Sequence, residues 1–225
     1  MAGKLIVFEG TDGSGKSTQF QRLCSRLEEE GTEFRRLVFP QYDKPSSALL
    51  RMYLKGEFGT RPSDVNPYAA STFYAVDRYA SWKKVWGDYY RGGGLVLSDR
   101  YTTSNAVHQA CKLPEEEWDG FFQWLSDFEF VKLGLPFPNL VFYLDMPTER
   151  AVALLRSREA ATHTSADIHE VDTAYLALCR RTALRAAQTL NWHIISCVDA
   201  DGALRTVEDI HTEIWDCLSR TGLGG

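Results

Sequence analysis

The chain has 225 residues, of which 44% are hydrophobic, and its formal net charge is −5. This length and composition fit one α/β domain with a real hydrophobic core. The negative balance excludes bulk electrostatic attraction to nucleic acid or to an anionic membrane, so we expect neither as a partner. Any phosphate binding must therefore come from local clusters of Arg, Lys and backbone N–H groups.

The cysteines and the apolar runs indicate a compartment. Five cysteines, at positions 24, 111, 179, 197 and 217, form no C-x-x-C pair. An odd, scattered set is typical of reduced thiols in a cytosolic protein. The first apolar run stops at Glu9, short of signal-peptide length, and no stretch approaches 18 apolar residues. We therefore expect a cytoplasmic protein with no membrane span.

The first predicted element is a strand at Leu5–Glu9 that leads into a phosphate-binding loop. Residues 10–17 read GTDGSGKS, a complete G-x-x-x-x-G-K-[ST] motif, and a helical pattern follows. Strand, glycine loop and helix are the context that this motif requires. Glycines let backbone N–H groups turn inward, and the helix N-terminus adds about half a positive charge. The motif predicts a nucleoside triphosphate site, with Lys16 on the β- and γ-phosphates and Ser17 on Mg²⁺.

The remaining elements alternate between strands and helices. Short apolar runs predict strands at Phe34–Phe39, Leu95–Ser98, Leu140–Leu144 and His193–Cys197. Asn66 and Pro67 predict the start of a helix that ends near Arg91, before three glycines. Near the C-terminus, a stripe at helical spacing predicts packing against the core. That stripe consists of Leu204, Val207, Ile210, Ile214 and Leu218. The pattern predicts an α/β fold with a five-stranded parallel sheet.

Polar residues follow the second and third strands. Ligands of open parallel sheets bind beyond the carboxyl ends of the strands, so we expect these residues and the phosphate loop to share one cleft. Asp99 suits a carboxylate associated with Mg²⁺. Arg100 is a candidate clamp for an acceptor phosphate, because a guanidinium fork matches phosphate oxygens. The alternatives are a turn aspartate and a surface salt bridge.

Five segments of the chain resemble the thymidylate kinase family, in the family's order. They read FEGTDGSGKSTQ at 8–19, FP at 39–40, FYAVDR at 73–78, SDRYTTSN at 98–105 and GLPFPN at 134–139. The set is far more specific than the glycine loop alone. It implies a three-layer α/β/α P-loop kinase fold as one domain, 1–225, with a short lid at about 156–167. The implied reaction transfers a phosphoryl group from ATP with Mg²⁺ to dTMP, giving dTDP and ADP.

The resemblance also implies roles for residues of the acceptor site. Tyr74 matches an aromatic that stacks on thymine, a contact worth about 1–3 kcal/mol. Arg78, one helical turn later, matches a contact to the base. Between Phe73 and Tyr74, helix packing is the alternative for one of the two. Tyr42 and Arg100 match groups that hold the acceptor phosphate, and Asn105 matches a polar base contact. The implied acceptor site comprises Phe39, Tyr42, Tyr74, Arg78, Arg100, Asn105 and His108.

The donor side and the lid complete the implied site. Family members that lack an arginine in the phosphate loop carry basic residues in the lid, and this chain has Arg156 and Arg158 there. The alternative for each is a solvated helix end. The implied ATP contacts are Gly10, Thr11, Asp12, Gly13, Ser14, Gly15, Lys16, Ser17 and Thr18. The implied catalytic residues are Lys16, Asp12, Arg100, Arg156 and Arg158. The implied metal contacts are Ser17, Asp99 and Glu170.

The chain departs from the family pattern at three positions. Gln41 replaces a frequent arginine, which weakens one phosphate contact. His108 replaces a tyrosine near the sugar 2′ carbon, and His169 replaces another tyrosine. Neither histidine is assigned a catalytic role. The aromatic-rich long helix resembles the helices through which the family forms dimers, so a homodimer is implied. The adenine contacts are expected in the loop 198–201.

Two other functions remain open from the residues alone. A deoxynucleoside kinase must deprotonate a 5′-hydroxyl, so it needs a carboxylate base near the end of the second strand. Only Asp43, which is displaced from that end, is available there. A non-enzymatic GTP-binding switch is disfavoured because the chain has no Asn-Lys-x-Asp motif.

Overall fold

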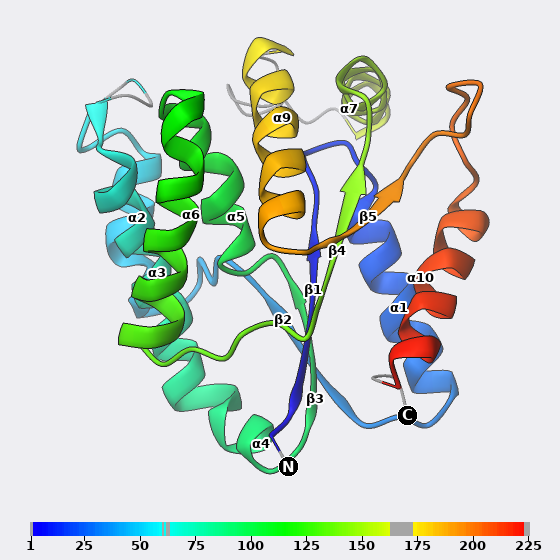
Figure 1. The fold of residues 1–225 in the computed structure, drawn as a ribbon, viewed down its shortest axis with the longest axis horizontal. Helices are drawn as coiled ribbons and strands as arrows, with labels where there is room; N and C mark the ends of the chain where they lie inside the picture. The colour runs from blue at the N-terminus through cyan, green and yellow to red at the C-terminus, as the bar shows by residue number, and fades with distance from the viewer. Residues whose placement is uncertain (1, 60, 62–63, 163–172, 223–225) are drawn as a thin grey trace. The chain divides into compact units, whose positions relative to one another are not determined.

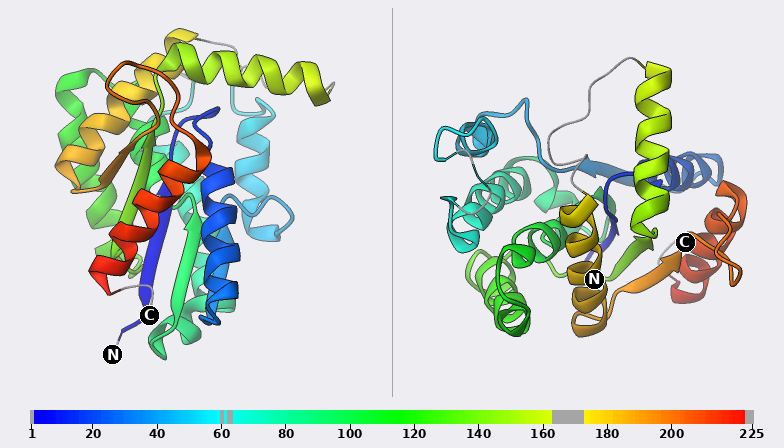
Figure 2. Two further views of the ribbon diagram at one scale, coloured as in Figure 1. Left: turned by 90° about the vertical axis from the view of Figure 1, so that its right-hand side faces the viewer. Right: turned by 90° about the horizontal axis from the view of Figure 1, so that it is seen from above.

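The computed structural model describes residues 2–59, 61, 64–162 and 173–222, without the side chains of residues 158–162. The chain divides into two compact units. The first comprises residues 1–7 and 34–139, and the second comprises residues 8–33 and 140–225. Figure 1 and Figure 2 trace the chain from blue to red.

The strands form one sheet in the order β2-β3-β1-β4-β5. The strands are β1 (Lys4–Glu9), β2 (Phe34–Val38), β3 (Leu95–Asp99), β4 (Leu140–Asp145) and β5 (His193–Ser196). The β2–β3 and β4–β5 pairs are parallel, with Phe34 opposite Leu95 and Phe142 opposite His193. The α/β class with a five-stranded sheet is confirmed. Each predicted strand is present, with its ends within one residue of those expected.

The first unit contains β2, β3 and a group of helices. They are α2 (Ala48–Leu54), α3 (Pro67–Ser81), α4 (Gly87–Arg91), α5 (Thr103–His108) and α6 (Trp118–Ser126). Two π-helical segments, Trp82–Trp86 and Asp127–Lys132, continue α3 and α6. Short 3₁₀ turns lie at Pro45–Ser47, Ala110–Lys112 and Glu115–Glu117. All residues of β3 are buried, as expected of a central parallel strand.

The long helical segment begins as predicted. The Asn66 side chain accepts a hydrogen bond from Tyr68 N, and Pro67 occupies the first helical position. Its aromatic excess has a simpler explanation than an interface. Trp82 and Trp86 are buried, and their ring centroids lie 4.6 Å apart in an edge-to-face pair. These two aromatics of the long helix therefore belong to the core.

The second unit contains β4, β5 and four helices in its described part. They are α1 (Lys16–Glu29), α7 (Thr148–Thr162), α9 (Thr173–Thr189) and α10 (Val207–Thr221). Helices α1 and α10, blue and red in Figure 2, lie side by side. The Gln19 side chain of α1 donates to Val207 O at 2.8 Å. Phe8 packs on Phe20 and Phe142, which joins β1, α1 and β4 in one core.

Two predicted boundaries in this unit are wrong. Helix α10 begins at Val207 because the Thr206 side chain caps it by accepting from Asp209 N, so Leu204 lies before it. Leu204 and Val207 are both exposed and do not extend the buried stripe. Helix α7 continues through Thr162, so the part of the expected lid up to that residue is helical. The rest of the expected lid, to residue 167, includes positions outside the described residues.

The predicted state of the cysteines agrees with the structure, because all five are buried thiols outside any disulfide. Within the described ranges, no helix combines the length and the apolar character needed to cross a membrane.

Candidate active site

The phosphate loop belongs to the second unit and has the backbone shape that its glycines permit. Gly13 has φ 79° and Gly15 has φ 81°, in the left-handed region that favours glycine. Gly15 caps the N-terminus of α1. A Cβ at Gly13 would lie 2.6 Å from the carbonyl oxygen of Ala151, on α7. Gly15 is therefore required by its backbone conformation. Gly13 is required by its conformation and also by the close approach of Ala151.

The N-terminus of α1 is suited to an anion. No acidic side chain lies in its first turn. Lys16 is buried, whereas Ser17 and Thr18 are exposed and Asp12 is half-buried. The helix dipole and the first backbone N–H groups favour negative charge at this point. The predicted donor-side residues thus form one contiguous loop and helix start.

Buried polar groups hold the phosphate loop from behind. Glu9, with no exposed surface, accepts a hydrogen bond from Gly10 N at 3.0 Å. Burial raises the pKa of Cys197 to about 12, and the nearby Asp145 adds to the effect. The thiol is therefore protonated at neutral pH and donates to Ser14 O at 3.6 Å. These contacts hold the backbone of the loop at Gly10 and Ser14.

The acceptor-side residues belong to the first unit, and a buried carboxylate anchors the segment after β2. Phe39 N donates to Asp99 O at 3.0 Å, which joins the ends of β2 and β3. Asp77, 1% exposed, accepts from Gln41 N at 2.8 Å and from Ser46 Oγ at 2.6 Å. The peptide bond between Phe39 and Pro40 is cis. The anchored segment leaves the Tyr42 side chain half exposed.

Helix α3 separates the roles of its two adjacent aromatic residues. The Phe73 ring packs against Tyr53 and Phe58, with centroids 6.0 and 5.6 Å away. Phe73 is therefore the packing residue of the pair, which leaves Tyr74 as the stacking candidate.

Tyr74 shares its electrostatic environment with three other predicted acceptor-side residues. Burial raises the pKa of Tyr74 well above its ordinary value. Tyr53 and Tyr42 act in the same direction, while Arg100 and Arg78 oppose them. The Tyr74 hydroxyl is thus neutral at physiological pH, in a cluster with Tyr42, Arg78 and Arg100.

Arg100 follows β3 in an unusual backbone conformation. Its φ is 65°, which a residue with a side chain rarely adopts and which costs about 1–3 kcal/mol. Ser98 Oγ donates to Arg100 O at 2.6 Å and supports this turn. Arg100 Nη1 lies 3.3 Å from Ser104 Oγ and 3.1 Å from His108 Nε2. The structure therefore brings two predicted acceptor-site residues, Arg100 and His108, into direct contact.

Arg78 has a partner that the sequence analysis did not identify. Arg78 Nε and Nη2 donate to the two carboxylate oxygens of Glu129, at 2.7 and 2.5 Å. Asn105 Nδ2 donates to Glu129 Oε1 at 3.2 Å. All three side chains are at most 2% exposed. Glu129 thus joins the two residues predicted to contact the base.

A sequence signal for Glu129 exists. The buried residues of α6 are Trp118, Phe121, Phe122 and Leu125, at helical spacing. Glu129 stands four residues after Leu125, on the same stripe. A carboxylate at a core position requires a buried cationic partner. That requirement would have directed attention to the arginine of the long helix.

The structure gives less support to the predicted roles of some other residues. Arg156 lies on α7 and is exposed. The Arg158 side chain and residues 169 and 170 lie outside the described part of the chain. Asp43 forms an exposed ion pair with Lys44 at 2.8 Å, and that hydrogen bond lowers the pKa of the Asp43 carboxyl. A lowered pKa makes Asp43 a weaker base for deprotonating a hydroxyl.

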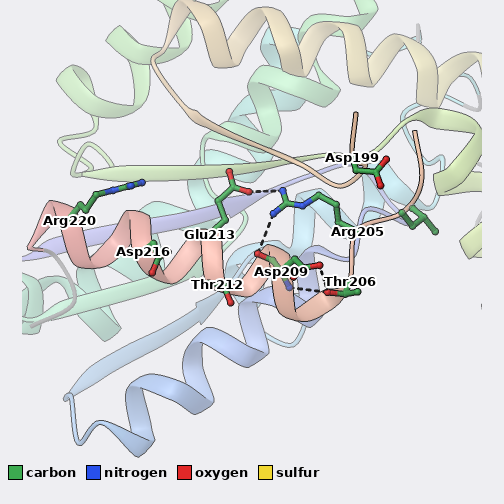
Figure 3. A pocket seen from close by; sticks show the side chains of 9 residues that line it. Asp199, Arg205, Thr206, Asp209, Thr212, Glu213, Asp216 and Arg220 are labelled. Carbon is green, nitrogen blue, oxygen red and sulfur yellow. Dashed lines mark hydrogen bonds and ion pairs between the residues drawn. The ribbon is translucent and has the colours of Figure 1, made fainter. Parts of the chain in front are cut away.

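A pocket of about 770 Å³ lies beside the loop predicted to contact adenine. Its lining residues are Asp199, Leu204, Arg205, Thr206, Asp209, Thr212, Glu213, Asp216 and Arg220. Figure 3 shows Arg205 between Glu213 and Asp209, and its Nη1 donates to Glu213 Oε2 at 2.6 Å. Leu204 alone among the lining residues is apolar. Base sites are mostly apolar, so the adenine location remains a prediction.

The fold and the loop together define a class of protein. A parallel α/β sheet whose first strand enters a G-x-x-x-x-G-K-[ST] loop at a helix N-terminus defines a P-loop nucleotide-binding protein. The model of the family "Thymidylate kinase" matches residues 8–214. The chain belongs to the thymidylate kinase family.

Individual relatives agree with this assignment. The chain is 35% identical to a thymidylate kinase of Mycobacterium tuberculosis over 155 residues, 68% of this chain and 71% of the relative. It is 29% identical to a thymidylate kinase of Caenorhabditis elegans, across 97% of this chain and 92% of the relative. A solved thymidylate kinase structure from Candida albicans matches all of this chain and 94% of its own, with a TM-score of 0.72 and 19% identity. That structural likeness supports the fold.

Proposed function

We propose that this protein transfers the γ-phosphoryl group of ATP, bound with Mg²⁺, to dTMP and so produces dTDP and ADP. Membership in the thymidylate kinase family supports this reaction. The observation that carries the proposal is that Arg78 and Asn105, both proposed to contact the base, meet on the buried Glu129. Arg78 and Arg100 also act on the pKa of Tyr74. An aromatic ring beside two guanidinium groups suits a ligand with one flat base and one phosphate.

Each acceptor-side residue has a role in this proposal. Tyr74 stacks on thymine, and Arg78 and Asn105 contact the edge of the base. Arg100 and Tyr42 hold the acceptor phosphate, and Phe39 shapes the segment that carries Tyr42. The contact of Arg100 with His108 supports a position of the histidine beside the phosphate clamp, and we assign it to the sugar side of the acceptor. Asp12 contacts the sugar 3′-hydroxyl or the metal.

The protein's task in this reaction is to position charge. The second pKa of a nucleoside monophosphate is about 6, so its phosphate is a dianion at neutral pH and already a nucleophile. No strong general base is needed. Positioning two anions in line contributes about 7–11 kcal/mol. Lys16 neutralises charge on the β- and γ-oxygens, and Arg156 or Arg158 of the lid stabilises the transferred group.

The residues present fit Mg²⁺ bound through its substrate. No cluster of three or more His, Cys, Asp or Glu side chains suited to a metal occurs among the residues that the structure describes. Mg²⁺ bound to nucleotides usually keeps water and phosphate ligands and takes only one or two protein oxygens. Ser17, Asp99 and Glu170 are the proposed contacts. When bound, the ion neutralises phosphate charge.

We also propose a cytoplasmic homodimer. Buried free thiols suit a reducing compartment. Val76 and Tyr79 of α3 are exposed side chains one helical turn apart. Such a patch is typical of a protein interface. Sedimentation at micromolar concentration should give twice the chain mass, and a monomer would contradict the dimer.

A coupled assay of ADP release tests the proposed reaction. The acceptors compared are dTMP, dUMP, dCMP, dGMP and thymidine. We expect ADP release that depends on dTMP, with dTDP as the product. Release with thymidine instead of dTMP would identify a deoxynucleoside kinase, and GTP binding without any acceptor-dependent turnover would identify a switch.

A further inference from the structure

Glu129 forms the centre of a buried polar network in the first unit. Its carboxylate accepts from Arg78 Nε and Nη2 and from Asn105 Nδ2. Arg78 Nη1 also donates to Tyr101 O at 3.3 Å. Glu129 has no exposed surface. A carboxylate so deeply buried does not contact solvent, and its role is exerted through the two side chains that it holds.

The network fixes the orientation of the Asn105 amide. Its nitrogen donates to Ser71 O and to Glu129 Oε1, each at 3.2 Å. A backbone carbonyl and a carboxylate are both pure acceptors, so only the amide nitrogen can face them. Both hydrogens of that nitrogen are then used. Only the amide oxygen is left to meet a ligand, and it meets the ligand as an acceptor.

Arg78 supplies the opposite polarity. A guanidinium carries five N–H donors and no acceptor. Glu129 and Tyr101 take three of these hydrogens, which leaves one on each terminal nitrogen. The pair therefore offers one acceptor, from Asn105, and donors, from Arg78. Thymine and uracil present an N3–H donor beside the O4 acceptor, whereas cytosine presents an unprotonated N3 beside an amino donor.

We propose that Glu129 is a positioning residue that fixes the hydrogen-bonding polarity of Arg78 and Asn105, and so makes the acceptor site select oxo pyrimidines over amino pyrimidines. This inference rests on the proposed function. The polarity distinguishes dTMP from dCMP and has no bearing on the methyl group that separates dTMP from dUMP. If Glu129 only supported the fold, replacing it would change the preference for dTMP over dCMP and the preference for dTMP over dUMP by the same factor.

The backbone around Glu129 supports a specialised role. Glu129 is the one buried residue of the π-helical segment Asp127–Lys132. Single π-helical turns within helices occur frequently at functional sites. The π turn places a carboxylate in the core while Asp127, two residues earlier, forms an exposed ion pair with Lys132 at 2.6 Å. The segment thus contains its own matched control.

The test compares Glu129→Gln with the control Asp127→Asn, using kcat/KM for dTMP, dUMP and dCMP. The amide introduced by Glu129→Gln brings hydrogens of its own to the network, so the Asn105 amide loses its fixed orientation. We expect the preference for dTMP over dCMP to fall at least about tenfold, because one well-placed base contact is worth about 1–3 kcal/mol of discrimination. The preference for dTMP over dUMP should stay within about twofold. Asp127→Asn should leave both preferences unchanged.

Other outcomes overturn the inference. An unchanged preference for dTMP over dCMP in Glu129→Gln, or an equal fall in both preferences, would show that Glu129 only supports the fold. If Glu129→Gln does not yield folded protein, Glu129→Asp keeps the charge but shortens the reach, and its preference over dCMP should fall as well. An unaltered preference there contradicts the inference.

The wild-type protein separates this inference from the proposed function. A wild-type protein that phosphorylates none of the three pyrimidine nucleotides contradicts the proposed function and the inference with it. If the wild-type protein prefers dTMP over dCMP and the Glu129 variant keeps the same preference, only the role of Glu129 is contradicted.

Discussion

The phosphate loop of the second unit and the proposed acceptor residues of the first unit are suited to phosphate and base by different means. The phosphate loop uses backbone N–H groups, a helix N-terminus and two glycines with positive φ. The acceptor half uses buried charged side chains, with Arg78 and Glu129 at its centre. The first site is encoded in eight consecutive residues, while the second joins residues 51 positions apart. Mutations of the loop glycines should therefore act through backbone geometry, and mutations of Arg78 and Glu129 through charge and polarity.

The largest effect should come from Lys16, the cation of the phosphate loop. Lys16→Met removes the cation next to the β- and γ-phosphates, and we expect kcat to fall about a thousandfold. The coupled ADP assay measures this effect. The exposed Lys55→Met serves as the control and should retain wild-type turnover. Full activity in Lys16→Met would contradict the assignment of the phosphate loop.

In the acceptor half, removing one buried charge should destabilise the whole fold. Arg78→Met leaves Glu129 buried without its cation, which should lower the free energy of unfolding by about 3–5 kcal/mol. Urea denaturation measures this change. The double variant Arg78→Met with Glu129→Gln should recover part of the loss, because the uncompensated charge is gone.

A surface ion pair of the same unit provides the comparison. Lys132→Met breaks the exposed pair with Asp127 and should change stability by less than about 1 kcal/mol. Equal losses for Arg78→Met and Lys132→Met would contradict the importance of the buried network.

The next effect should come from the backbone geometry at Gly13 of the phosphate loop. Gly13→Ala combines a positive φ with a Cβ 2.6 Å from Ala151 O, so we expect a loss of about 1–3 kcal/mol and weaker ATP binding. Gly31→Ala is the matched control, since its φ is 69° and nothing lies within 4 Å of its added Cβ. It should cost about 1–2 kcal/mol and leave ATP binding unchanged. Thermal unfolding and nucleotide titration separate the two variants.

The smallest effect should be a pH dependence of stability that comes from His211 in the second unit. His211 on α10 is 4% exposed, and burial lowers its pKa, with Arg22 and Arg26 adding to the effect and Glu208 opposing it. A lowered folded pKa means that the unfolded chain binds the proton more readily. Stability is therefore complete above about pH 6.5 and declines as pH falls below it.

The measurement is the Tm at pH 7.5 and at pH 5.5. We expect the wild-type Tm to fall between these two pH values, and to fall less in His211→Gln. An identical pH dependence in the variant would show that other groups cause the decline.

The sequence predicted the elements whose signals are local. The five strands are short apolar runs, and Asn66 with Pro67 marks a helix start within two residues. The glycine loop carries its own shape. Leu204 was misassigned because the Thr206 cap, and not the apolar stripe, determines where α10 begins. Local capping overrode periodicity at that boundary.

The side-chain network of the acceptor half was only partly predictable. The resemblance to a family supplied Arg78 and Asn105, but Glu129 depends on a contact with another segment and on a π-helical turn. The buried stripe of α6 marks Glu129 as a core position, but neither its partner in another segment nor the π-helical turn has a local signature. Trp82 and Trp86 likewise turned out to be core residues because the π-helical segment directs them inward against Tyr90 and Tyr101.

The most direct test of the account is equilibrium binding of dTMP and of a non-hydrolysable ATP analogue to two variants. Lys16→Met should lose affinity for the analogue and keep its affinity for dTMP, and Arg100→Ala should show the reverse. A matching loss of both ligands in both variants would contradict the assignment of ATP to the phosphate loop and of dTMP to the acceptor residues.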